Sequence, residues 1–280
     1  MRVNGRAARG VSLLERGLHY GDGLFETIAC VAGRARFLDR HLRRLTEGCA
    51  RLAMPPVDAA GLRREIETLA AGAARAVIKL LVTRGAAVTR GYALTGREQP
   101  TRIMLRYPWP GDDPTLARDG VRVRIARLRL GENPALAGLK HCNRLEQVLA
   151  RAEWTDTGIT ESLLFSSSGA LISGTMTNVF LVRDSMLVTP RMDRCGVAGV
   201  MRAVVLDLAA EAGIAAGERV LEARHLAQAQ ELFLTSALTG IRPVRELDGR
   251  TLAPGPVTRA LQARLTARLQ GDARRGALDE

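Results

Sequence analysis

Fifteen residues near the middle of the chain decide the fold: Asn133-Pro134-Ala135-Leu136-Ala137-Gly138-Leu139-Lys140-His141-Cys142-Asn143-Arg144-Leu145-Glu146-Gln147. Lys140 lies where this loop opens onto a predicted helix, whose Leu145, Val148 and Leu149 are spaced to face a core. Burial in such a place lowers the pKa of a lysine and supplies the neutral amine that imine chemistry needs. The alternative is a solvated lysine at the start of a helix.

Lysine is rare in a chain rich in arginine. The 280 residues include 41 Lys and Arg, but the only lysines are Lys79 and Lys140. A preference for arginine codons explains the bias. A lysine in such a chain can nevertheless mark a position that needs an amine for imine formation, because a guanidinium stays protonated and cannot form an imine. Lys79 is the competitor of Lys140, although strand alternation places it beside Val77 and Leu81, where its amine can extend to solvent.

The net charge of +12 leaves nucleic acid, a membrane surface or a small anionic ligand open as partners. Aromatic residues make up only 4% and the basic residues form no block, which argues against nucleic acid. No apolar run approaches the ~18 residues of a membrane helix, and the N-terminus lacks the apolar core of a signal peptide. We therefore expect a soluble cytoplasmic protein with no membrane or nucleic-acid partner, and a small anionic substrate stays open as its ligand.

The four cysteines indicate neither a metal site nor a disulfide framework. No CxxC pair occurs, and the cysteines and four histidines do not follow a metal-ligand spacing. Reduced thiols and no bound metal are expected. The cysteines are Cys30, Cys49, Cys142 and Cys195.

Two domains of mixed α and β structure are expected, because single cores stop growing near ~250–300 residues. The clearest linker is the proline-rich segment 108–117. It separates a small N-terminal α+β domain, residues 1–107, from a larger C-terminal domain, residues 118–280. Many short strands separated by turn residues predict a barrel-like or sandwich-like mixed architecture with outer helices for the larger domain.

The spacing of apolar and turn residues predicts individual elements. Asp39 is expected to cap a helix that ends before Pro55, and Asp58 a second helix ending near Gly72. A third helix is expected from Gly199 to Glu211. The expected strands are residues 76–82, 102–107, 121–130, 162–165, 178–182, 186–188 and 233–236, and a glycine turn precedes a further strand through Val31.

Several segments can hold an anion. The small-residue turn Gly196 to Arg202 opens onto a helix whose free N–H groups and dipole favour a phosphate, although it can equally be an ordinary helix start. The strand end Thr235-Ser236-Ala237 can add donors. Arg43 or Arg44 can point inward from the first helix, or both can be solvated.

Two arginines occupy a glycine-containing loop between strands. Arg84 and Arg90 can clamp substrate carboxylates, since a guanidinium binds a carboxylate through two parallel hydrogen bonds. Loop arginines are more often solvent-facing.

Taken together, the segments resemble the fold-type IV pyridoxal-phosphate enzymes, the class of branched-chain and D-amino-acid transaminases, and within it the aminodeoxychorismate lyases. The stretch 133–147 favours the lyases. The other matching pieces are Tyr20-Gly21-Asp22-Gly23-Leu24-Phe25-Glu26-Thr27, His41-Leu42-Arg43-Arg44-Leu45, Arg90-Gly91-Tyr92, Asn178-Val179-Phe180, Thr189-Pro190-Arg191 and Gly196 to Arg202.

The resemblance implies pyridoxal 5'-phosphate as the cofactor, carried by Lys140 as a Schiff base, in a homodimer. It implies Arg44 and the amides of Val200 and Met201 as phosphate ligands, with Ser236 and Ala237 nearby. It also implies Asn178 and Ser173 as cofactor-binding positions, and Thr27 is expected at the ring edge. The candidates for the substrate are Arg84, Arg90, Tyr92, Tyr107 and Arg144, the last of which stands where branched-chain transaminases have a tyrosine.

Ser173 departs from the family pattern. A glutamate five residues before the asparagine of Asn-x-Phe pairs with the protonated pyridine nitrogen in the family, and here that position is Ser173, five before Asn178. A serine cannot hold the nitrogen charged, which handicaps transamination more than an elimination that ends in an aromatic ring. The expected activity is therefore lyase activity that releases 4-aminobenzoate. A transaminase on the same fold and a non-catalytic basic binding protein remain the alternatives.

Overall fold

The computed structural model describes residues 1–87, 90–111 and 113–278 and divides into two compact units. The first unit comprises Met1–Pro110 and Leu139–Arg144, and the second comprises Gly111–Gly138 and Leu145–Glu280. The division after Pro110 falls inside the predicted linker, of which Asp112 lies outside the described residues and Pro114–Arg118 form helix α4. The six residues around Lys140 thus belong with the first unit, whereas the sequence placed them in the larger domain.

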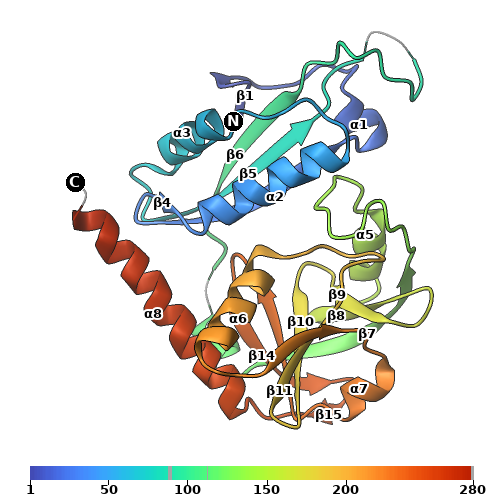
Figure 1. Ribbon diagram of the computed structural model, residues 1–280, viewed down its shortest axis with the longest axis vertical. Coiled ribbons are helices and arrows are strands. Elements are labelled where there is room, and N and C mark those ends of the chain that lie inside the picture. Colours follow the sequence, from blue (N-terminus) through green and yellow to red (C-terminus); the bar gives the residue numbers. More distant parts are fainter. Residues whose placement is uncertain (88–89, 112, 279–280) are drawn as a thin grey trace. The chain divides into compact units, whose positions relative to one another are not determined.

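The first unit is an antiparallel sheet with two main helices on one face (Figure 1). Its strand order is β2-β1-β6-β5-β3-β4. The elements are β1 (Arg2–Val3), β2 (Arg6–Ala7), α1 (Arg16–Tyr20), β3 (Gly23–Val31), β4 (Arg34–Ala35), α2 (Leu38–Arg51), α3 (Ala59–Ala70), β5 (Arg75–Thr83) and β6 (Thr101–Pro108).

Alternation in β3 and β5 gives this sheet two different faces. Ile28 and Ile78 are cross-strand partners on the face beneath α2 and α3, and both are fully buried. On the opposite face Thr27 pairs with Lys79, and both are only half-buried. The helices therefore cover a closed apolar core, while the other face carries polar side chains.

The predicted helices of this unit form, but one predicted cap is wrong. Asp58 caps α3 and accepts a hydrogen bond from the Gly61 amide at 2.8 Å, as expected. The N-cap of α2 is Phe37, in the left-handed region at φ 52°, and it makes no side-chain cap bond. Asp39 lies inside the first turn and pairs with Arg63 of α3 instead.

The second unit is built on a mixed nine-stranded sheet. Its main order is β12-β11-β10-β13-β14-β7-β8-β9, with β15 on β14, and the pairs β11·β12, β14·β7 and β7·β8 are parallel. The terminal strand β9 also contacts β10 and β11, so the sheet curls into a half-barrel. The strands are β7 (Val121–Leu130), β8 (Ile159–Ser166), β9 (Leu171–Gly174), β10 (Asn178–Arg183), β11 (Met186–Pro190), β12 (Ala216–Arg219), β13 (Glu231–Ser236), β14 (Gly240–Leu247) and β15 (Arg250–Thr251).

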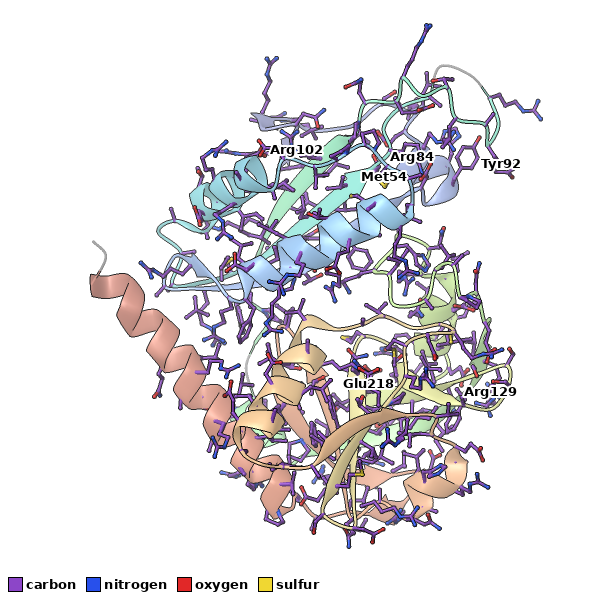
Figure 2. All side chains as sticks on the ribbon, viewed as in Figure 1. Met54, Arg84, Tyr92, Arg102, Arg129 and Glu218 are labelled. Carbon is purple, nitrogen blue, oxygen red and sulfur yellow. The ribbon has the colours of Figure 1, made fainter. Side chains whose placement is uncertain are left out.

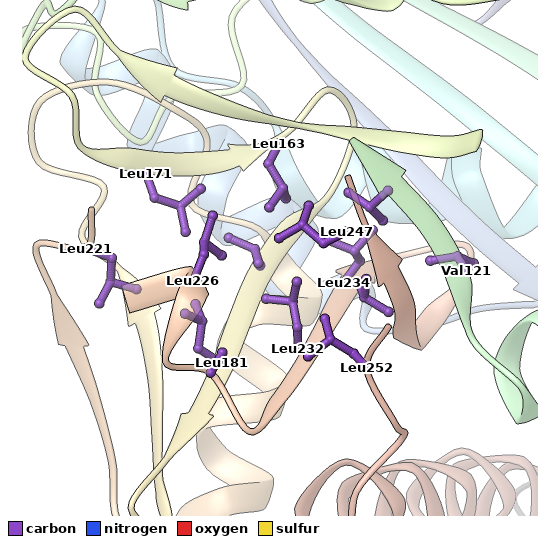
Figure 3. Packing of buried hydrophobic residues seen from close by; sticks show 14 of the residues in the cluster. Val121, Leu163, Leu171, Leu181, Leu221, Leu226, Leu232, Leu234, Leu247 and Leu252 are labelled. Atoms are coloured by element: carbon purple, nitrogen blue, oxygen red, sulfur yellow. The ribbon is translucent and has the colours of Figure 1, made fainter. Parts of the chain in front are cut away.

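Leucines and valines from both ends of this curled sheet fill its interior (Figure 3). Leu163 of β8, Leu181 of β10 and Leu234 of β13 meet there, all nearly inaccessible to solvent. Fully burying a leucine contributes about 2 kcal/mol, so the leucines of this cluster stabilise the unit substantially.

Helices α5 (Leu145–Arg151), α6 (Val200–Glu211), α7 (Ala223–Ala227) and α8 (Pro256–Leu278) pack outside the sheet. The expectation that the apolar residues of α5 face the core is wrong. Leu145, Val148 and Leu149 are 76%, 60% and 60% exposed, and Ala150 is the buried residue. The helix therefore packs against the sheet through the small side chain of Ala150, and its leucines face outward.

Candidate functional site

The segment that carries Lys140 is attached to the edge of β3. The Phe25 amide donates to the Lys140 carbonyl and the Cys142 amide donates to the Gly23 carbonyl, each at 2.9 Å. Leu24 and His141 form an antiparallel bridge between these bonds. Backbone pairing therefore fixes Lys140 against the strand that carries Phe25, Glu26 and Thr27.

Gly21 makes this attachment possible. It ends α1 in the left-handed region at φ 64°, and a Cβ there would lie 2.1 Å from Oδ1 of Asn143. A side chain at this turn would push the lysine segment away from β3. Gly21 of the Tyr20-to-Thr27 motif thus serves the placement of Lys140.

The amine of Lys140 is half-buried over an aromatic ring. Its Nζ lies 4.2 Å from the centroid of Phe25. Burial lowers the pKa of Lys140 to about 8, and the charges of Arg44, Arg144 and Lys79 act in the same direction while Glu26 opposes them. Roughly a tenth of the side chain is then neutral at pH 7, far more than for a solvated lysine.

Lys79 approaches the same ring from β5. Its Nζ lies 5.5 Å from the Phe25 centroid, and its cross-strand partner is Thr27. The predicted alternation is confirmed, since Lys79 shares a face with Val77 and Leu81. Both lysines of the chain therefore flank Phe25.

Glu26 is a buried carboxylate that sequence analysis did not single out. It is 1% exposed, accepts a 2.8 Å hydrogen bond from Nε of Arg44, and also contacts Nη2 of Arg44. Nδ1 of His41 lies 2.6 Å from Oε2 of Glu26, the oxygen that Nη2 of Arg44 also contacts. The available signal was a charge inside the apolar alternation of Leu24, Glu26 and Ile28.

These contacts decide the charge of the cluster. Burial opposes the ionisation of Glu26, but the hydrogen bond from His41 and the charge of Arg44 outweigh it and lower the pKa of Glu26. Burial lowers the pKa of His41, against the pull of Glu26. Glu26 and Arg44 are thus an ion pair with a neutral histidine beside it, and the sequence was right that one arginine of Arg43-Arg44 turns inward.

Arg144 follows the lysine on the same segment. Its Nε donates to the His141 carbonyl at 3.0 Å, and its Nη2 lies 2.6 Å from Nε2 of His141. Burial, together with the charge of Arg144, lowers the pKa of His141 to about 4. Arg144 therefore lies against a neutral imidazole, and its charge also lowers the pKa of Lys140.

Arg84 lies inside the first unit, close to Met54 (Figure 2). It is 6% exposed, and its guanidinium donates to Asp22 and to the carbonyls of Leu52 and Ala53 at 2.8 to 2.9 Å. These bonds tie β5 to the end of α2. Its hydrogen-bonding capacity serves the fold of this unit.

The remaining candidates for the substrate are exposed. Arg90 is exposed, and Tyr92 is 82% exposed on the outer edge of the unit (Figure 2), where its ring lies 5.1 Å from that of Tyr20. Arg16 donates to the carbonyls of Gly91 and Tyr92, each at 3.2 Å. Tyr107 is 46% exposed at the end of β6. These side chains are available to a ligand.

In the second unit, the turn before α6 has the form that an anion site needs. Gly199 is the N-cap, and α6 starts with Val200 and Met201, whose amides have no carbonyl partner within the helix. A Cβ at Gly199 would lie 2.0 Å from Oδ1 of Asn178, whose Nδ2 donates to the Val197 carbonyl at 2.9 Å. Asn178 therefore holds this turn against β10.

Ser173 is buried near the end of β9, and its Oγ donates to the Gly174 carbonyl at 2.8 Å. The following turn closes on Glu161 of β8, which is 2% exposed. Glu161 accepts hydrogen bonds from the amides of Ser162, Thr175 and Met176 and from the hydroxyls of Thr175 and Thr177, at 2.5 to 3.1 Å. Sequence analysis missed Glu161 because its partners in this turn lie 14 to 16 residues away, and no local motif reveals such contacts.

Ser236 and Ala237 lie at the end of β13, as expected. The Ser236 hydroxyl lies 2.8 Å from the Thr239 hydroxyl and accepts from the Thr239 amide at 3.1 Å. Beside it, the buried hydroxyl of Thr235 has no hydrogen-bond partner among the described residues. A polar atom without a partner at this depth is costly unless a ligand satisfies it.

Each unit by itself carries groups of a kind that an aldehyde or a phosphate can use. In the first unit these are the Lys140 amine with its lowered pKa and the Arg44 guanidinium. In the second unit they are the first turn of α6 and the Thr235 hydroxyl. Within the residues described, no helix is long and apolar enough to cross a membrane. Nor does this part of the chain hold a group of three His, Cys, Asp or Glu side chains placed for a metal.

Comparisons with known proteins identify a matching family. Residues 23–247 match the family model for amino-transferase class IV. A crystal structure of 4-amino-4-deoxychorismate lyase from Pseudomonas aeruginosa superposes with a TM-score of 0.91, at 48% identity over 94% of this chain and 97% of that one.

Two sequence relatives represent both activities. Aminodeoxychorismate lyase from Vibrio harveyi is 32% identical over 96% of this chain and 98% of its own length. A putative branched-chain-amino-acid aminotransferase from Methanocaldococcus jannaschii is 33% identical, over 90% of this chain and 88% of its own.

Proposed function

Because the chain belongs to the amino-transferase class IV family, we propose that it is an aminodeoxychorismate lyase. It would eliminate pyruvate from 4-amino-4-deoxychorismate and leave 4-aminobenzoate, a step of folate biosynthesis. The observation that carries the proposal is the half-buried amine of Lys140, whose pKa is lowered to about 8. The 48% identity to a lyase structure supports this activity over the transaminase one.

Pyridoxal 5'-phosphate is the proposed cofactor, and when bound it supplies an electron sink for the reacting substrate. Lys140 is the residue to which it would be attached. Arg44, the amides of Val200 and Met201, and Ser236 with Ala237 would hold its phosphate. Asn178 fixes the turn before α6, and Thr27 stands on the same face of the first sheet as Lys79.

Lys140 has a second role in this proposal. When not attached to the cofactor, Nζ of Lys140 would take the proton from the amino-bearing ring carbon, and the ring would gain its last double bond as the adjacent C–O bond to the enolpyruvyl group breaks. The same Nζ then gives a proton to the enolpyruvyl group as it leaves. A pKa near 8 suits both transfers, since proton exchange is efficient when the pKa lies near the working pH.

Ser173 favours elimination over transamination. Its hydroxyl is neutral and is engaged with the Gly174 carbonyl, so it does not supply the negative charge of the family glutamate. A weaker electron sink suffices where the product gains an aromatic ring.

Arg144 and Arg90 are the proposed partners of the two substrate carboxylates, with Tyr92 and Tyr107 as further contacts. The charge of Arg144 acts on the Lys140 amine, and Arg90 is exposed. Arg84 was a third candidate, but its bonds within the first unit make it the weakest of them.

The choice between activities rests on products. Incubated with 4-amino-4-deoxychorismate, the protein is expected to release pyruvate and 4-aminobenzoate in equal amounts. Incubated with a branched-chain or D-amino acid and 2-oxoglutarate, it is expected to form no glutamate above background. Glutamate formation without 4-aminobenzoate would establish the transaminase instead. If neither 4-aminobenzoate nor glutamate forms, the result favours a non-catalytic binding protein.

We also propose a cytoplasmic homodimer. The cysteines of the chain are free thiols, which suits a reducing compartment. Leu145, Val148 and Leu149 give α5 an exposed apolar surface that a second copy can cover. Light scattering of the purified protein is expected to give twice the chain mass, and a monomer at micromolar concentration would contradict the dimer.

A further inference from the structure

We propose that Glu26 is a positioning residue, which holds the Arg44 guanidinium in place and balances the positive charges around the Lys140 amine. The inference rests on the proposed function, because it concerns the readiness of Lys140 to react with an aldehyde. Glu26 makes no part of the proposed ligand set, and its effect would pass through Arg44 and Lys140.

The geometry links Glu26 to Lys140 through neighbouring residues. Phe25 supplies the ring beneath the Lys140 amine and the amide that bonds the Lys140 carbonyl. Glu26 follows on β3 and points to the helix face, where two guanidinium nitrogens of Arg44 contact its two oxygens. This forked contact restricts the orientation of the Arg44 guanidinium.

Glu26 is a carboxylate whose charge opposes the other effects on the Lys140 amine and raises its pKa. The cations that face the amine come from three elements: Arg44 of α2, Lys79 of β5 and Arg144 of the lysine segment itself. His41 of α2 also lies close enough to be influenced by Lys140, but burial keeps it neutral. Without Glu26, the three cations would lower the pKa of Lys140 without its opposing charge.

The sign of the effect follows from these charges. Burial and the three cations lower the pKa of Lys140, and Glu26 raises it. Replacing Glu26 with glutamine therefore lowers the pKa of Lys140, because the favourable charge is lost while the cations stay. Replacing Arg44 with glutamine raises it, and removing both charges nearly restores the original value.

The test measures the pKa of Lys140 without the cofactor phosphate. The full-length protein, freed of cofactor, is mixed with pyridoxal between pH 6 and pH 10, and the adduct is trapped with borohydride and assigned by peptide mass mapping. Pyridoxal carries no phosphate, so a lost phosphate contact in Arg44→Gln does not affect the rate. The midpoint of the rate against pH reports the neutral fraction of the amine.

Glu26→Gln is expected to shift this midpoint down by about half a pH unit or more, and Arg44→Gln to shift it up. The double variant is expected to lie near the wild type. Glu47→Gln removes the same charge from an exposed position on α2 and is expected to leave the midpoint unchanged. If Glu26→Gln does not fold, the Arg44→Gln and double variants make the same comparison, and the double variant must have the lower midpoint.

A midpoint that Glu26→Gln leaves at the wild-type value would overturn the inference. So would a double variant no lower than Arg44→Gln. Failure of the proposed function looks different, since pyridoxal would then form no adduct at Lys140 in the wild type.

Discussion

Replacing Lys140 with alanine is expected to reduce 4-aminobenzoate formation by at least about a thousandfold, because the variant loses both the attachment point and the acid-base group. The residue contributes little to the fold, since its amine is only half-buried and its backbone carbonyl, not its side chain, bonds the Phe25 amide. The loss would therefore appear in kcat at an almost unchanged melting temperature. Continuous measurement of pyruvate release gives the rate.

Lys79→Ala is the matched control. It removes the other lysine at the Phe25 ring, 5.5 Å from its centroid, and leaves the Lys140 segment intact. This variant is expected to keep most of the activity. Activity retained in Lys140→Ala but lost in Lys79→Ala would reverse the assignment of the two lysines.

Glu161→Ala is expected to lower the free energy of unfolding by about 3 kcal/mol, because two amides and two hydroxyls of the turn after β9 would lose their buried acceptor. The same turn connects Ser173 to Asn178, which holds the start of α6. The affinity for pyridoxal 5'-phosphate is therefore expected to fall at least about tenfold as well. Urea unfolding and cofactor titration measure the two effects.

Glu246→Gln serves as the control for charge alone. Glu246 is a partly exposed residue on β14 that pairs with Arg122 at 3.0 Å, and such pairs contribute less than about 1 kcal/mol. It is expected to leave cofactor affinity unchanged. A Glu161→Ala protein as stable as Glu246→Gln would show that the turn does not depend on Glu161.

The fold class and most elements could be predicted because the patterns are local. Strand 76–82 and the helix after Gly199 each show their period within a few residues, and both form as predicted. The stretch 133–147 indicated the family, since its residues are adjacent in sequence. The placement of its central six residues with the first unit could not be predicted, because it depends on bonds from Lys140 and Cys142 to β3.

The supporting charges of the site were harder to find. Glu26 meets Arg44 across 18 residues and Glu161 meets its turn across 14 or more, so their partners emerge only when strands and helices pack. For Arg84 the sequence showed a loop arginine beside a glycine, which describes a ligand clamp and a structural tie equally well. The structure shows its bonds to Asp22, Leu52 and Ala53. The predicted orientation of α5 was also wrong, because the helical spacing of apolar residues does not distinguish a face that packs on the core from one that a second copy can cover.

The central claim is that Lys140 carries the cofactor. The most direct measurement is the visible spectrum of the protein with pyridoxal 5'-phosphate, followed by borohydride reduction and peptide mass mapping. We predict an absorbance near ~410–420 nm that borohydride abolishes, and a single phosphopyridoxyl group on the peptide that contains Lys140. A colourless protein, or a label on the Lys79 peptide alone, would contradict the claim.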